Sequence, residues 1–172
     1  MKSDSKYKIE FAGLKIGSHQ FNFNADKKFF DRFNFSDFND VSVNIDIDLT
    51  KKSTLLELDF VLTGDVNLNC DLTNEPFDYK IKHKASLVVK FGQDYNDEDD
   101  EILVLPHGEH KLYVDQYIFE LIVLSLPPKR IHPGVEDGSL KSEILDILED
   151  LKPKENSNLA DPRWEQLKSL KK

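Results

Sequence analysis

The stretch that decides the fold is residues 55–91, which read LLELDFVLTGDVNLNCDLTNEPFDYKIKHKASLVVKF. In its first half the apolar side chains occupy even positions from Leu56 to Cys70, interrupted at Gly64. In its second half they occupy odd positions from Phe77 to Phe91. Alternation with a period of two puts the apolar residues of a strand on one face. The stretch therefore predicts a long β-hairpin whose two arms bury a common face.

The turn between the arms determines how they pair. Residues 71–76 contain asparagine, aspartate and proline, which are typical of turns. A centre between Thr73 and Asn74 pairs Cys70 with Phe77 and keeps the apolar sets of both arms on one face. A slip by one residue would turn one apolar set outward, so this register is the one we expect.

Shorter alternating segments precede the hairpin. Residues 41–49 alternate between aliphatic and polar side chains, and residues 7–11 and 21–24 repeat the pattern with aromatic residues. Residues 26–33 carry phenylalanines at helical spacing and predict a brief helix. Strands joined by short turns pair in an antiparallel manner. We expect an α+β fold in which an antiparallel meander, forming a partly closed sheet, surrounds the long central hairpin.

Two apolar segments after the sheet predict helices. Residues 116–126 are apolar on nearly every side, follow Asp115 as a suitable N-cap and end before Pro127. A helix of this kind is expected to be buried against the sheet. Residues 140–151 show a single apolar stripe after Ser139, which predicts an N-cap and an amphipathic surface helix. The sheet should thus be covered by one buried helix and short C-terminal helices.

The chain divides into one domain and a tail. A single core accommodates residues 1–152 without difficulty. Within it, residues 93–101 carry six acidic side chains and predict a solvated, mobile acidic loop. A calcium loop is the alternative, although the central glycine of such a loop is missing. Residues 153–172 predict a tether and a short terminal docking helix that begins near Asp161 and carries Trp164.

Composition limits the classes of partner and compartment. The formal net charge of −9 and the isoelectric point near 5.0 disfavour a protein that coats nucleic acid by bulk electrostatics, so we expect no DNA binding. A single cysteine cannot form an internal disulfide, and the polar first residues do not resemble an export signal. The most apolar run is shorter than the ~20 residues that span a bilayer. These features predict a cytoplasmic protein without a membrane partner.

The sequence offers no signature of catalysis. It has no glycine-rich phosphate loop, no G-x-S-x-G and no H-E-x-x-H, so we expect neither an enzyme nor a cofactor. His107 and His110 have a spacing that can hold a metal on a helix, but Pro106 and Gly108 indicate a loop. The lone Cys70, at a strand end on the buried face, is interpreted as a small hydrophobic residue.

Three separated stretches carry a family resemblance. They read NCDLTNEPF at residues 69–77, ELIVLSLPPKRIH at 120–132 and DPRWEQLKSL at 161–170. In this order they resemble the YceD-like family of large ribosomal RNA subunit accumulation proteins. That family usually has a C-x-x-C pair at the hairpin tip, where this chain has Thr73 in place of the second cysteine. If relatives hold a metal there, only a remnant survives here, and a structural zinc site needs four ligands. We expect no bound metal. The surviving residues of this degenerate site are Cys70 and His132.

The resemblance implies a non-enzymatic factor in large ribosomal subunit biogenesis, which supports 23S rRNA accumulation by binding rRNA or a basic ribosomal protein. The acidic residues 93–101 suit a basic protein. A lysine stripe on one hairpin arm suits rRNA phosphates, or is only a solvated outer face. A general interaction module unrelated to ribosomes and, less favoured, a small-molecule binder are the alternatives. The partner-binding candidates are Lys80, Lys82, Lys84, Asp161, Arg163 and Trp164.

Overall fold

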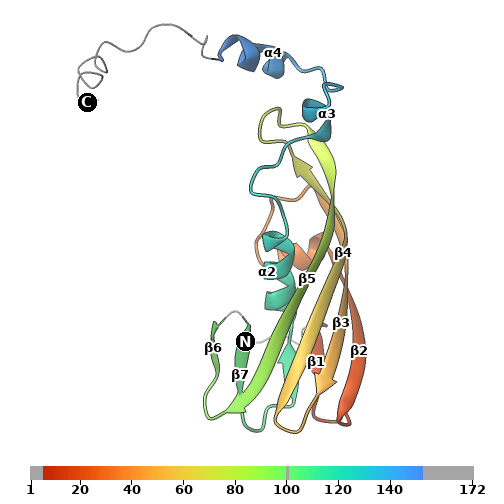
Figure 1. Cartoon of the computed structure of the whole chain (residues 1–172), viewed down its shortest axis with the longest axis vertical. Helices are drawn as coiled ribbons and strands as arrows, with labels where there is room; N and C mark the ends of the chain where they lie inside the picture. The colour runs from red at the N-terminus through yellow and green to blue at the C-terminus, as the bar shows by residue number, and fades with distance from the viewer. Residues whose placement is uncertain (1–5, 100, 153–172) are drawn as a thin grey trace, which may run out of the picture.

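The computed structural model describes residues 6–99 and 101–152, and within them the chain forms a long twisted sheet with helices along one side (Figure 1). Six strands pair in the order β2-β3-β4-β5-β7-β6, and β1 pairs with β8 in a separate ribbon. The elements are β1 (Lys8–Glu10), β2 (Gly17–Asp26), α1 (Lys27–Asp31), β3 (Asp40–Lys51), β4 (Leu55–Asn69), β5 (Pro76–Gly92), β6 (Asn96–Asp99), β7 (Ile102–Pro106), β8 (Lys111–Tyr113), α2 (Asp115–Leu124), α3 (Pro133–Glu136) and α4 (Glu143–Asp150).

The central hairpin forms as predicted, but its register differs by two residues. Leu68 faces Phe77, whereas Cys70 lies outside the ladder. The reason is a turn closed within the tip: the N–H of Cys70 donates to the carbonyl of Glu75 at 2.9 Å, and the N–H of Asn74 donates to the carbonyl of Cys70 at 2.8 Å. Asn74 adopts a left-handed φ of 58° to complete it. A shift by two leaves every side chain on its predicted face.

The sheet is mixed and open rather than partly closed. Strands β2 to β5 form the predicted antiparallel meander, but β7 runs parallel to β5, with Val88 opposite Ile102. Part of the predicted acidic loop is β6, an edge strand whose Asn96 pairs with Val104. Main-chain hydrogen bonds to β7 require no apolar side chain, which is why an acidic segment can pair there. Residues 96–99 are therefore a strand and not a loop, although all four are exposed to solvent as expected.

Gly64 allows two strands to approach closely. A Cβ atom at this position would lie 2.2 Å from the carbonyl oxygen of Ser42 and 2.6 Å from Cα of Val43. Both atoms belong to the backbone of β3, which pairs with β4 here. The gap in the apolar pattern of β4 thus reflects a site where no side chain fits.

The helix α1 and the residues after it contribute several members of a phenylalanine cluster. The N-cap of α1 is Asp26, whose carboxylate accepts the N–H of Phe29 at 3.0 Å. Phe30 and Phe33 both contact Phe119 of α2, and the rings of Phe33 and Phe119 stack with centroids 4.4 Å apart. The aromatic cluster thus joins α1 to α2.

The sequence predicted a buried helix, but α2 packs only one apolar stripe against the sheet. Only Ile118 and Ile122 are fully buried, and Leu124 is 77% exposed. The N-cap is Val114 rather than Asp115, whose carboxylate instead accepts the N–H of Gln116. Phe119 contacts the phenylalanine cluster, and Tyr117 and Leu121 line a pocket, so these side chains are only half-buried.

The C-terminal elements lie beyond the hairpin tip (Figure 1). The N-cap of α4 is Ser142, because Ser139 belongs to a turn in which its N–H donates to the carboxylate of Asp137. The predicted apolar stripe is exposed on α4, at Ile144, Ile147, Leu148 and Leu151. The predicted terminal helix, with Asp161, Arg163 and Trp164, lies outside the described residues.

Candidate functional site

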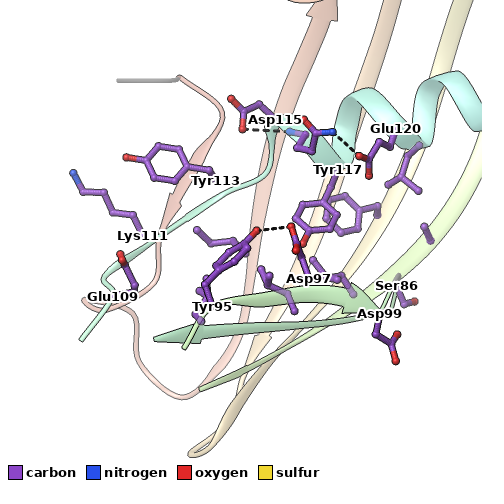
Figure 2. Close-up of a pocket in the computed structure, with 18 of the residues that line it drawn as sticks. Ser86, Tyr95, Asp97, Asp99, Glu109, Lys111, Tyr113, Asp115, Tyr117 and Glu120 are labelled. Atoms are coloured by element: carbon purple, nitrogen blue, oxygen red, sulfur yellow. Dashed lines mark hydrogen bonds between the residues drawn. The ribbon is translucent and has the colours of Figure 1, made fainter. Parts of the chain in front are cut away.

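A pocket of about 590 Å³ opens between α2 and the strands β6 and β7 (Figure 2). These two strands lie at the end of the sheet away from the hairpin tip (Figure 1). The apolar lining of the pocket includes Phe60 and Leu103 of the core and Leu121 and Leu124 of α2. We call it the acidic pocket and define it by the three tyrosines and five carboxylates in its lining. These are Tyr95, Asp97, Asp99, Glu109, Tyr113, Asp115, Tyr117 and Glu120.

Local structure brings these side chains together from separate segments. Tyr95 precedes β6, whose alternation points Asp97 and Asp99 to one side of the strand. Tyr117 and Glu120 are three residues apart on α2 and therefore share a helix face. Figure 2 shows Glu109 and Asp99 at opposite ends of the pocket, with the side chains of Tyr95, Asp97 and Tyr117 between them. The acidic side chains are therefore spread along the length of the pocket.

The carboxylates of the acidic pocket outnumber its cations. Asp115 pairs with Arg32 at 3.3 Å, and Lys111, the lysine in the lining, pairs with Glu10 at 3.5 Å instead of with a pocket carboxylate. Throughout residues 6–99 and 101–152, no cation lies within 4.0 Å of the remaining four carboxylates, which are Asp97, Asp99, Glu109 and Glu120. The pocket therefore carries uncompensated negative charge.

The pKa values of Tyr95 and Tyr117 are raised in the acidic pocket. The hydroxyl of Tyr95 donates to the carboxylate of Asp97 at 3.1 Å. Burial raises the pKa of Tyr117, and the charges of Tyr95, Asp97 and Glu120 raise it further. The pKa of Tyr95 is raised by burial, by the hydrogen bond to Asp97 and by nearby carboxylates. Both phenols therefore remain neutral donors at physiological pH.

The carboxylates do not converge as metal ligands do. In the described part of the chain, no group of three or more histidine, cysteine, aspartate or glutamate side chains is arranged to hold a metal ion. A cation with several carboxylate oxygens around one point would need such a group. The acidic pocket is better suited to a ligand that carries its positive charge along its length.

At the hairpin tip the structure brings together the two residues of the predicted metal-site remnant. The backbone N–H of His132 donates to Sγ of Cys70 at 3.3 Å, while the ring Nδ1 of His132 accepts the N–H of Gly134 at 2.9 Å. The ring also meets Phe77 edge to face, with centroids 5.6 Å apart. His132 thus contacts Cys70 through its backbone and uses its ring for capping and packing.

Hydrogen bonds around Cys70 lower the pKa of its thiol. Burial acts to raise the pKa of the thiol, but hydrogen bonds from the Thr73 hydroxyl and from the N–H groups of His132, Thr73 and Leu72 outweigh it, so the pKa is lowered. Thr73 is buried and supplies one of these bonds. The tip thus surrounds one thiol with several hydrogen-bond donors.

Reciprocal hydrogen bonds attach the segment before α3 to the hairpin tip. The N–H of Asp71 donates to the carbonyl of Arg130 at 2.8 Å, and the N–H of Arg130 donates to the Asp71 carboxylate at 2.7 Å. The segment that follows α2 therefore runs past the hairpin tip before it reaches α3 (Figure 1). These contacts explain why residues of two distant sequence motifs meet here.

The predicted lysine stripe lies on the exposed outer face of β5. Lys80, Lys82 and Lys84 are exposed, and none has a carboxylate within 4.0 Å among the residues that the structure describes. They lie where β5 pairs with β4 alone, because β7 joins only from Val88 onward. Lysines on an open edge prevent pairing with other sheets, so this stripe has a structural explanation besides a contact with phosphates.

Sequence reasoning recognised the acidic segment but missed the acidic pocket. The signal for it was Tyr95, an aromatic residue within an otherwise charged run, together with Tyr117 and Glu120 on one helix face. The pairing of β6 with β7, and the position of α2, are tertiary features that bring these groups together.

The chain matches a family model. No curated protein and no solved structure matches the chain. The family model of the large ribosomal RNA subunit accumulation protein YceD matches residues 58–171, which include most of the hairpin, α2 and the acidic pocket. Because this match covers more than half of the chain, the chain belongs to the YceD family.

Proposed function

We propose that this protein is a non-enzymatic factor in large ribosomal subunit biogenesis, which supports 23S rRNA accumulation by binding a ribosomal component in the cytoplasm. The observation that carries the proposal is the family match over residues 58–171. It spans the surfaces best suited to partners, namely the acidic pocket and the lysine stripe.

The structure offers two surfaces of opposite charge for that component. The lysine stripe would meet RNA phosphates, and the acidic pocket would meet a basic protein. No helix within the described residues is long and apolar enough to cross a membrane. The terminal residues Asp161, Arg163 and Trp164 remain candidates for a further contact with the same partner.

Gradient sedimentation of cell lysate tests the biogenesis role. We expect cells depleted of the protein to lose large subunits relative to small ones, and we expect the protein to migrate with large-subunit precursors. Re-expression of the wild-type chain should restore the balance. Normal subunit levels in depleted cells, together with no co-migration, would overturn the proposal.

The two surfaces can be separated in the same assay. A Lys80→Gln, Lys82→Gln, Lys84→Gln variant removes positive charge from exposed side chains. If rRNA contacts this stripe, the variant will fail to restore large subunits and will retain less RNA after crosslinking. Restoration equal to wild type would assign the three lysines to the solvated edge of the sheet.

A further inference from the structure

We infer that the acidic pocket binds an arginine-containing basic segment of a partner protein, whose guanidinium groups lie between its carboxylates and tyrosines. This inference rests on the proposed function for its biological setting and names the class of partner. It commits to a protein ligand in preference to RNA, a metal ion or an apolar molecule.

Charge and shape together select this ligand. Four carboxylates without a described cation partner are spread from Glu109 to Asp99 along the pocket (Figure 2). Phosphate would be repelled, and an apolar ligand would remove these carboxylates from water without compensation. An extended chain with successive positive side chains matches charges that are distributed along a groove.

The tyrosines favour arginine. Tyr95 is 51% exposed, and its hydroxyl donates to the Asp97 carboxylate, so this side chain is held in place without being fully covered. A guanidinium group can stack on an aromatic face while it forms paired hydrogen bonds with a carboxylate. Tyr117 and Glu120 provide a second aromatic and acidic pair on α2.

An apolar rim lies next to these groups. Leu124, at the end of α2, lines the pocket and is 77% exposed. An exposed apolar side chain beside these carboxylates can contact the aliphatic part of an arginine side chain. The pocket therefore combines cation recognition with a small hydrophobic contact.

Fluorescence anisotropy with purified full-length protein tests the inference. The probe is a short fluorescein-labelled peptide in which arginine alternates with glycine, and its neutral match replaces each arginine with citrulline. We expect the arginine peptide to bind and the citrulline peptide not to bind. Binding should weaken with added salt, since exposed charge pairs are screened.

Matched variants locate the binding. Asp97→Asn with Glu120→Gln should weaken peptide binding by about tenfold or more, because two carboxylates of the pocket lose their charge while keeping their shape. Glu143→Gln with Asp150→Asn makes the same change in net charge on α4 and should leave binding unchanged. Tyr95→Ala should weaken binding by about threefold, the effect expected of an exposed cation–π contact, whereas Tyr95→Phe should retain the stacking.

Each opposing result has a definite meaning. Equal weakening in the pocket variant and the α4 variant would overturn the inference, because only bulk charge would then be involved. Displacement of the peptide by spermidine at equal charge concentration would assign the pocket to small polyamines and overturn the protein ligand. Pocket-dependent binding of a short single-stranded RNA would also overturn it. Because these assays use no ribosomes, failure here leaves the gradient experiment as an independent test of the biogenesis role.

Discussion

The backbone N–H of His132 donates to Sγ of Cys70 at 3.3 Å, although 62 residues separate them in the sequence. This contact joins the hairpin tip to the segment that leads from α2 into α3. It places a buried thiol among several N–H and O–H donors, which stabilise the charged form of the thiol.

The lowered pKa of Cys70 predicts a pH-dependent stability. A group whose pKa is lower in the folded state than its unfolded value, here 9.0, stabilises the fold fully above that value, and the contribution is lost as the pH falls through the folded pKa. The free energy of unfolding of wild type, relative to a Cys70→Ala variant, should thus increase as the pH rises toward 9.0. Urea unfolding of both proteins across neutral to alkaline pH measures this difference. A constant difference would contradict it.

Thr73→Val tests the source of that shift. The substitution removes the hydroxyl that donates to Cys70 while keeping a similar volume, so the thiol pKa should rise toward its ordinary value. Thiolate absorbance in the ultraviolet, followed against pH, reports the change. Ser139→Ala, a substitution at an exposed turn beyond the tip, serves as the control and should leave the titration unmoved.

Zinc content provides a separate prediction for the same tip. With Thr73 in place of a cysteine and the His132 ring accepting the N–H of Gly134, we expect purified protein to carry no stoichiometric zinc. Elemental analysis after purification without chelators is the measurement. One zinc per chain would show that ligands from elsewhere complete the site.

Gly64→Ala should destabilise the sheet by about 2–3 kcal/mol, because the new methyl group would collide with the β3 backbone and force the strands apart. Gly13→Ala is the matched control, since a Cβ atom there has no neighbour within 4 Å. Urea unfolding measures both. Similar stabilities for the two variants would refute the close approach of β3 and β4.

The single-stripe packing of α2 predicts opposite results for two of its aliphatic residues. Ile118→Ala should lower the free energy of unfolding by about 3 kcal/mol, because Ile118 is fully buried and its truncation leaves a cavity. Leu124→Ala should cost less than about 0.5 kcal/mol, because the side chain is mostly exposed. A large loss at Leu124 would instead support the all-round burial that the apolar sequence predicts.

Much of the fold follows from local pattern. The alternation in residues 55–91 correctly assigned the faces of β4 and β5, because side chains alternate along any strand whatever its partner. The register was wrong because it depends on hydrogen bonds inside the turn, which place Cys70 outside the ladder. A register shift of two residues keeps every side chain on the same face of the sheet, but it changes which residues lie opposite each other.

The sequence by itself determined the long hairpin, the meander before it, the acidic character of residues 93–101 and the resemblance that the family match confirmed. Tertiary structure decided the rest. The parallel pairing of β7 with β5 leaves β6 as an edge strand. The helix α2 packs one side against the sheet and lines the pocket that contains Tyr95 with another. The hairpin tip contacts His132 through Cys70. Local propensity describes how each segment presents its side chains, but only long-range packing determines which segments those side chains meet.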